Sequence, residues 1–201
     1  MAKKKVHAAR RPAPRSSKKK PAPAGGRPRP KAALSRSTPA AVKAAALSLL
    51  AWVHGTTDAL AGGIPPEKAT YQPSAKDNHL LWTLGHLATA YSWFASLIDG
   101  KAAALPEEFD RMFGYRSAPV ADPTAYPSIE MVRKHYDAAF KRLTEAVSAL
   151  KPADLHKPTV GDSHGFANSR IDVVYKAIWH DGWHSGQLSS IRRALGLGPM
   201  M

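Results

Sequence analysis

The sequence predicts an all-α protein, a four-helix bundle preceded by a disordered basic tail. Four segments of about 22–27 residues carry apolar side chains at helical spacing, bounded by cap residues, glycine or proline. No segment shows the alternation of polar and apolar residues that is typical of a strand. The connections 100–127 and 151–168 are long for a simple up-and-down bundle, which predicts crossover connections or loops that shape a pocket.

The tail, residues 1–38, holds +13 of the formal charge of +14 and contains no acidic residue. It has almost no bulky apolar side chain, so it cannot bury enough surface to offset the entropy lost on ordering. Two interpretations stay open: a solubilising tail, or weak contact with nucleic acid or another polyanion. The nearly neutral residues 39–201 suit one globular domain of ordinary size.

The first two helices follow the tail. Thr38 and Pro39 form an N-cap followed by proline at the first helical position, and Gly62 and Gly63 end a helix over residues 40–61. A second helix is predicted over residues 77–99, ending at Gly100. The predicted apolar face of the first helix comprises Val42, Ala46, Leu49, Leu50, Val53 and Leu60.

A short helical turn near residues 106–112 and two further long helices complete the predicted bundle. The third long helix covers residues 128–150 and is ended by Pro152. The fourth begins at Ser169, whose spacing to Asp172 resembles a capping box, and continues to Leu195 before Gly196.

Cysteine is absent, so disulfides, cysteine-based zinc sites and a catalytic protein thiol are excluded. Any thiol chemistry would need a low-molecular-weight thiol as co-substrate. No segment reaches the roughly 20 apolar residues that a membrane helix needs. We therefore expect a cytoplasmic protein without a membrane partner, and its assembly as a homodimer is left open.

Two histidines four residues apart, His180 and His184, share one face of the last predicted helix. This spacing lets both imidazoles bind one divalent metal at about 2.0–2.1 Å. His86, in the second predicted helix, is the favoured third ligand. His79 lies on the same face about 10.5 Å before it, too far to share one metal with His86, so it is the alternative third ligand. Three histidines and an open position are typical of a catalytic rather than a structural metal centre.

Other residues near these histidines are candidates for supporting roles. Asp181 could accept a hydrogen bond from a histidine, although an adjacent residue points about 100° away on the helix, and Gln187 could contact a ligand or a neighbouring helix. Gly182 and Gly186 indicate close packing or room for a ligand. Tryptophans 82, 93, 179 and 183 are expected mostly in the core. The candidate substrate contacts are His79, Trp82, His164 and Trp183.

The motif His180-x3-His184-x-Gly-Gln-Leu, followed by Arg-Arg-x-Leu-Gly, resembles the last helix of the DinB-like superfamily of metal-dependent four-helix-bundle proteins. The run from Asn78 to Leu87 is similar to the family's second-helix motif, whose closing histidine is the first metal ligand. The resemblance covers about residues 40–199. It implies that His86, His180 and His184 bind a divalent metal such as zinc or nickel.

The same resemblance suggests two enzyme classes acting on a small-molecule substrate. Some relatives are S-transferases that use a small thiol, and others are assigned only as hydrolases. The competing hypothesis is a non-catalytic bundle that keeps a metal for stability or serves in a stress response. An open metal position favours the enzyme, whereas a fourth protein ligand would favour the structural role.

Overall fold

The computed structural model describes residues 37–102 and 105–198. These residues form five α-helices and no strand, so the predicted all-α class is confirmed. One of the five is a short helix at the position where a helical turn was expected. The predicted tail lies outside the described residues, except for its last two positions. The helices are α1 Pro39–Gly62, α2 Leu80–Asp99, α3 Glu107–Phe113, α4 Ile129–Ala149 and α5 Arg170–Ala194.

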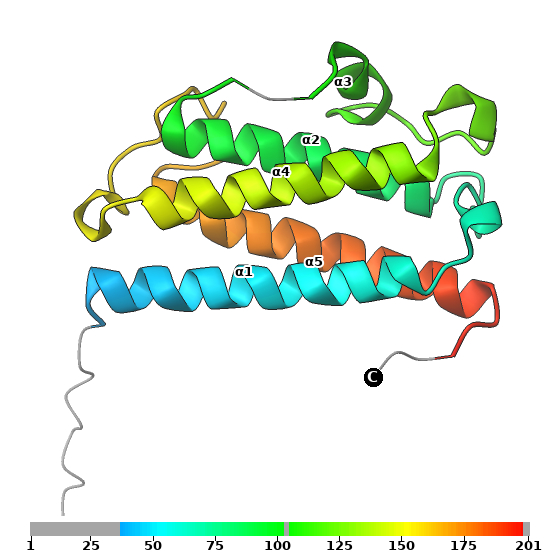
Figure 1. Cartoon of the computed structure of the whole chain (residues 1–201), viewed down its shortest axis with the longest axis horizontal. Coiled ribbons are helices and arrows are strands. Elements are labelled where there is room, and N and C mark those ends of the chain that lie inside the picture. The colour runs from blue at the N-terminus through cyan, green and yellow to red at the C-terminus, as the bar shows by residue number, and fades with distance from the viewer. Residues whose placement is uncertain (1–36, 103–104, 199–201) are drawn as a thin grey trace, which may run out of the picture. The chain divides into compact units, whose positions relative to one another are not determined.

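The long helices pack as two parallel pairs (Figure 1). Helices α1 and α5 lie side by side and run in one direction, whereas α2 and α4 lie side by side and run in the other. The connection from α2 to α4 must therefore return along the bundle, and α3 forms part of this crossover. The connection from α4 to α5 joins helix ends at one end of the bundle, so only the first of the two long connections crosses over.

The helices begin at cap residues. Thr38 Oγ1 accepts a hydrogen bond from the Ala41 amide at 3.2 Å, and Ser169 Oγ accepts one from the Asp172 amide at 3.3 Å, both at predicted starts. Helix α2 begins three residues later than expected, because His79 is its N-cap and its Nδ1 accepts from the amide of Trp82.

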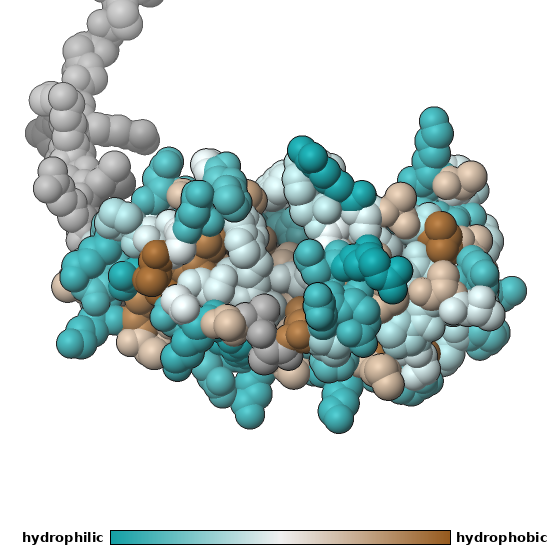
Figure 2. All heavy atoms as spheres, turned by 90° about the horizontal axis from the view of Figure 1, so that it is seen from above, coloured by the Kyte–Doolittle hydropathy of each residue, from teal (hydrophilic) through white to brown (hydrophobic). Residues whose placement is uncertain are grey.

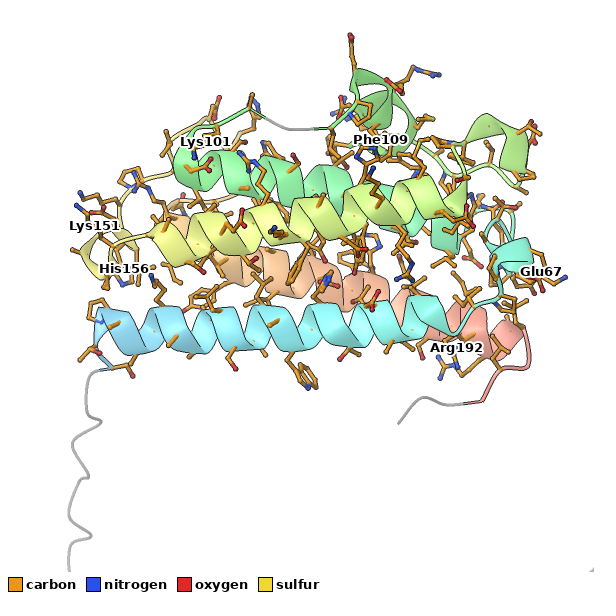
Figure 3. The ribbon with its side chains drawn as sticks, in the orientation of Figure 1. Glu67, Lys101, Phe109, Lys151, His156 and Arg192 are labelled. Carbon is orange, nitrogen blue, oxygen red and sulfur yellow. The ribbon has the colours of Figure 1, made fainter. Side chains whose placement is uncertain are left out.

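Helix α2 lies at the centre of the fold, and most of its side chains are buried. It contacts α3, α4 and α5, which explains why apolar residues surround it instead of forming a single stripe. Helix α3 covers one side of α2 and inserts Phe109, labelled in Figure 3, and Phe113 into the core, where both are at most 1% exposed. No helix in the described part of the chain is long and apolar enough to cross a bilayer.

Three apolar side chains expected in the core lie instead at the surface. Trp179 and Trp183 of α5 are 56% and 55% exposed, and Leu49 of α1 is 46% exposed. The expectation failed because α1 and α5 carry apolar residues on the outer side as well as on the core side. Helical periodicity alone does not distinguish the two sides of such a helix.

Candidate metal centre

Three histidine side chains from two helices meet inside the bundle. His86 comes from the middle of α2, while His180 and His184 lie one turn apart on α5. Nε2 of His180 lies 3.2 Å from Nε2 of His86 and 3.3 Å from Nε2 of His184. The three side chains each offer one ligand atom within 4.8 Å of the others. They therefore converge as the spacing predicts.

The hydrogen bond made by Nδ1 of His86 shows which of its two ring nitrogens carries the proton. Nδ1 lies 2.7 Å from the carbonyl oxygen of Phe113, which can only accept, so Nδ1 carries the proton and donates. In the neutral ring the lone pair is then on Nε2, facing the other two histidines. Trp82 stacks on the imidazole at a centroid distance of 4.6 Å and limits its rotation.

His184 is held in the same tautomer by Gln187. Its Nδ1 lies 2.8 Å from Oε1 of Gln187, and the same oxygen accepts from Nδ2 of Asn78 at 2.9 Å. An oxygen that accepts from both sides requires the proton of His184 on Nδ1 and leaves the lone pair on Nε2. Gln187 thus orients a histidine and joins α5 to the segment just before α2, while its contact with a ligand stays a prediction.

The converging nitrogens fit a cation better than they fit one another. His86 and His184 both turn lone pairs toward His180, whose Nε2 can donate a proton to only one of them at a time. Nδ1 of His180 is buried and has no hydrogen-bond partner among the described residues. Two or three facing lone pairs are the donor set that a divalent metal needs, and each outer ring is oriented as in known metal sites.

Burial keeps the imidazoles neutral. It is the main reason why the pKa of His184 is lowered to about 4 and that of His180 to about 3. Repulsion from His86 contributes to both shifts, and repulsion from His184 contributes to that of His180. Burial also lowers the pKa of His86, against the hydrogen bond to Phe113, which raises it. A metal ligand must be deprotonated at its donor atom, and these rings meet that condition at neutral pH.

Gly85 explains how α3 comes close enough to orient His86. A Cβ at this position would overlap the ring carbons of Phe113, whose carbonyl oxygen accepts from His86. The glycine beside the histidine in the sequence therefore makes room for the ring of Phe113.

Changing Gly85 to alanine is expected to reduce the unfolding free energy by about 1–3 kcal/mol, because the added methyl group overpacks a buried contact. Metal affinity should also fall, because Phe113 must move away from His86. Denaturant unfolding and a metal titration measure the two effects. Gly55→Ala in α1 is the matched control, since nothing lies within 4 Å of its added Cβ. Equal behaviour of both variants would contradict the assignment.

Asp181 lies on a neighbouring face of α5, about 100° from His180, and accepts no hydrogen bond from the three histidines of the metal centre. The carboxylate is fully buried and accepts hydrogen bonds from Thr57 Oγ1 of α1 and Tyr91 Oη of α2. Burial raises the pKa of Asp181, and the two hydrogen bonds oppose the shift. Close by, Nδ1 of His54 of α1 lies 3.1 Å from the hydroxyl of Tyr136 of α4 and 3.4 Å from that of Tyr91. This polar network therefore joins all four long helices.

Of the remaining candidate residues, Trp82 stacks on the ring of His86, whereas His79 and His164 make their contacts with other groups. His79 is buried, and both of its ring nitrogens are engaged, Nδ1 by the Trp82 amide and Nε2 by the Val120 carbonyl oxygen. His164 has an 81% exposed side chain and pairs with Asp162. Trp82 is buried and donates to Ser117 Oγ at 3.0 Å. Trp183 is exposed on α5, one residue before His184.

A cleft of about 770 Å³ lies between α2 and the segment leading into α3. Thr89 and Trp93 line it and share a face of α2 with His86, at intervals of three and seven residues. Thr89 Oγ1 donates to the His86 carbonyl oxygen at 2.8 Å, so this wall of the cleft lies one helical turn from His86, although none of the three histidines lines the cleft itself. The other side of the cleft contains Leu105, Pro106, Glu107, Glu108, Asp110 and Arg111.

Comparison with known proteins identifies the family to which the chain is similar. A sequence profile described as the DinB superfamily matches residues 49–188. A crystal structure of a conserved protein from Enterococcus faecalis has a TM-score of 0.57 with this chain at 15% identity, covering 77% of this chain and 98% of that one. At that identity the likeness shows the fold alone. No curated protein matches the chain.

Proposed function

The chain belongs to the DinB superfamily, and we propose that it is a divalent-metal-dependent enzyme that acts on a small molecule. His86, His180 and His184 would hold the metal. The family resemblance favours zinc or nickel, and both are among the ions that imidazole ligands bind well. The observation that carries the proposal is the convergence of three neutral imidazoles, one buried and two partly buried, with the lone pairs of His86 and His184 turned inward.

The number of ligands supports an enzyme over a structural metal site. The cluster contains three histidines, and no fourth histidine or acidic residue joins it within the described part of the chain. A structural zinc site is closed by four protein ligands, whereas a catalytic one keeps a position for water or substrate. A non-catalytic bundle with a stabilising metal is therefore the less favoured alternative.

A divalent metal bound with one open position supplies a nucleophile, by lowering the pKa of a water or of a thiol. The chain's own residues hold this centre in place: the Phe113 carbonyl fixes the ring of His86, and Gln187 fixes that of His184. No cysteine is present to serve as the nucleophile. A transferase reaction would therefore use a low-molecular-weight thiol, whose sulfur bonds to an electrophilic carbon while its proton goes to solvent and a leaving group departs.

The cleft between α2 and α3 is the place proposed for the rest of the substrate. Trp93, Leu105 and Pro106 offer an apolar surface, and the opposite rim carries three carboxylates and one guanidinium. This charge balance favours a neutral or cationic small molecule over an anion.

Metal analysis followed by an activity screen tests the proposal. The full chain is purified without added metal, its metal content is measured, and the stripped protein is reloaded with zinc or nickel. We expect about one ion per chain and metal-dependent activity in either a thiol–electrophile or an ester-hydrolysis assay. The variant with all three histidines changed to alanine should be inactive.

Two outcomes would end the proposal. If the wild-type chain binds neither ion at micromolar concentration, the centre is not a metal site. If it binds metal and the triple-alanine variant keeps full activity toward an identified substrate, the metal takes no part in the reaction.

A further inference from the structure

Helices α1 and α5 together expose five large apolar side chains. Trp52 is 64% exposed, and the others are between 46% and 56% exposed. Exposed apolar residues that stand singly are normal, but a contiguous group marks an interaction surface. The group, named the α1–α5 face below, consists of Leu49, Trp52, Tyr175, Trp179 and Trp183.

The five side chains form one surface because the two helices are parallel neighbours (Figure 1). Val53 of α1 lies next to Gly182 of α5. Trp52, one residue before Val53, therefore lies at about the same height along the helix pair as Trp179, three residues before Gly182. The residues of α5 succeed one another at intervals of four, and the rings of Trp179 and Trp183 contact each other at a centroid distance of 4.8 Å.

The charged side chains of α1 and of the middle of α5 are turned away from this face, buried or paired, and Arg193 lies beyond it in the last turn of α5. The charged residues of α1 both turn to α4: Lys43 donates to the carbonyl oxygen of Leu150 at 2.8 Å, and Asp58 pairs with Arg133. On α5, Asp181 is buried and Lys176 pairs with Asp172. A charged occupant such as the basic tail would lose hydration here without gaining a partner, so the face suits an equally uncharged surface.

Two glycines on the outer side of α5 point to a close approach from outside. Gly182 and Gly186 each cost the helix about 1 kcal/mol relative to alanine. A Cβ on Gly186 would meet nothing within 4 Å, and one on Gly182 would meet only Val53 at 4.0 Å. Packing among the described residues therefore does not require them, although the sequence had suggested close packing.

The area of the face is close to what a stable association needs. The exposed fractions of its five side chains amount to about 600 Å², taking about 150–250 Å² for each aromatic side chain. A standard interface buries about 800 Å² on each partner. The small residues around the tryptophans add exposed area to the face and bring its total close to this value. In contrast, Figure 2, which views the molecule from the side of α2 and α3, shows mainly hydrophilic side chains with scattered apolar ones.

We propose that the α1–α5 face is the interface of a homodimer. Two copies related by a two-fold axis present the same surface to each other, so an uncharged apolar face meets an identical one. The tryptophans of one copy then cover Gly182 and Gly186 of the other, where the absence of side chains leaves room. The partner is a second copy of this chain, and the inference does not depend on the metal or on the proposed reaction.

Sedimentation of the full chain tests the interface. Wild type should sediment at twice its 21.7 kDa mass. The measurement uses protein concentrations of about 1–100 μM, which cover the dissociation constants of the weaker standard-size interfaces. Trp52→Lys and Trp179→Lys should each raise the dissociation constant at least about 30-fold, as at a binding hot spot. Met131→Lys is the matched control, because Met131 is 52% exposed on α4, outside the face.

Circular dichroism shows whether each variant is folded, and Trp52→Gln and Trp179→Gln replace any lysine variant that is not. As a second measurement, the melting temperature of a dimer rises with protein concentration, and this rise should disappear in the face variants. The proposal is overturned if wild type is monomeric throughout the range, or if the face variants dimerise as tightly as Met131→Lys.

Discussion

Replacing His184 with alanine is expected to weaken metal binding at least about 100-fold, because even the loss of a residue that orients a ligand costs 10–100-fold. The change removes one of three ring nitrogens, and Nε2 of His180 loses a neighbour 3.3 Å away. The helical circular-dichroism signal should persist, since the apolar faces that hold the bundle are unchanged. A competition titration against a chromogenic chelator measures the affinity.

Two further variants make this result specific. His156→Ala is the matched control, because this histidine lies in the connection between α4 and α5 (Figure 3) and is exposed; its affinity should equal that of wild type. Gln187→Ala should give an intermediate loss of about 10–100-fold, since it frees the ring of His184. If His184→Ala binds zinc and nickel within about threefold of wild type, His184 is not a ligand.

Replacing Asp181 with alanine is expected to reduce the unfolding free energy by about 2–4 kcal/mol. The buried hydroxyls of Thr57 and Tyr91 lose their common acceptor, and each unsatisfied buried donor costs about 1–3 kcal/mol. The loss is limited because Thr57 Oγ1 also reaches the Val53 carbonyl oxygen at 3.2 Å. Urea unfolding of the metal-free protein measures the effect apart from any change in metal binding.

Asp58→Ala is the matched control for this prediction. Asp58 also joins two helices, through its pair with Arg133, but its side chain is 46% exposed. Exposed ion pairs contribute about 0–1 kcal/mol, so the control should lose less than Asp181→Ala. Equal losses would mean that the buried network does not hold the helices together. Asp181→Asn, which keeps one acceptor oxygen, should lie between the two.

Local sequence patterns predicted much of the fold and the meeting of the three histidines. Apolar periodicity and cap residues placed each long helix within three residues of its observed bounds, because caps act within a single turn. The pair His180 and His184 follows from helix geometry alone. His86 joins them because α2 and α5 pack together, which the sequence could suggest only through the family motif.

Other parts of the centre left no signal in the sequence. The acceptor for His86 is the backbone carbonyl of Phe113, and any residue type carries that group. Asn78 stood within the motif, but its contact with Gln187 depends on how α2 and α5 pack. The exposure of Trp179 was missed because helical periodicity does not tell which apolar side of a helix faces the core.

The parallel pairing of α1 with α5 affects how the chain can fold during its synthesis. Helix α1 is made first, but its main packing partner is made last, about 110 residues later. At translation rates of about 5–20 residues per second, the apolar side of α1 waits roughly 5–20 s for that partner. The bundle therefore cannot close until nearly the whole chain has left the ribosome, and the metal centre, with two of its three histidines on α5, is completed at the same late moment.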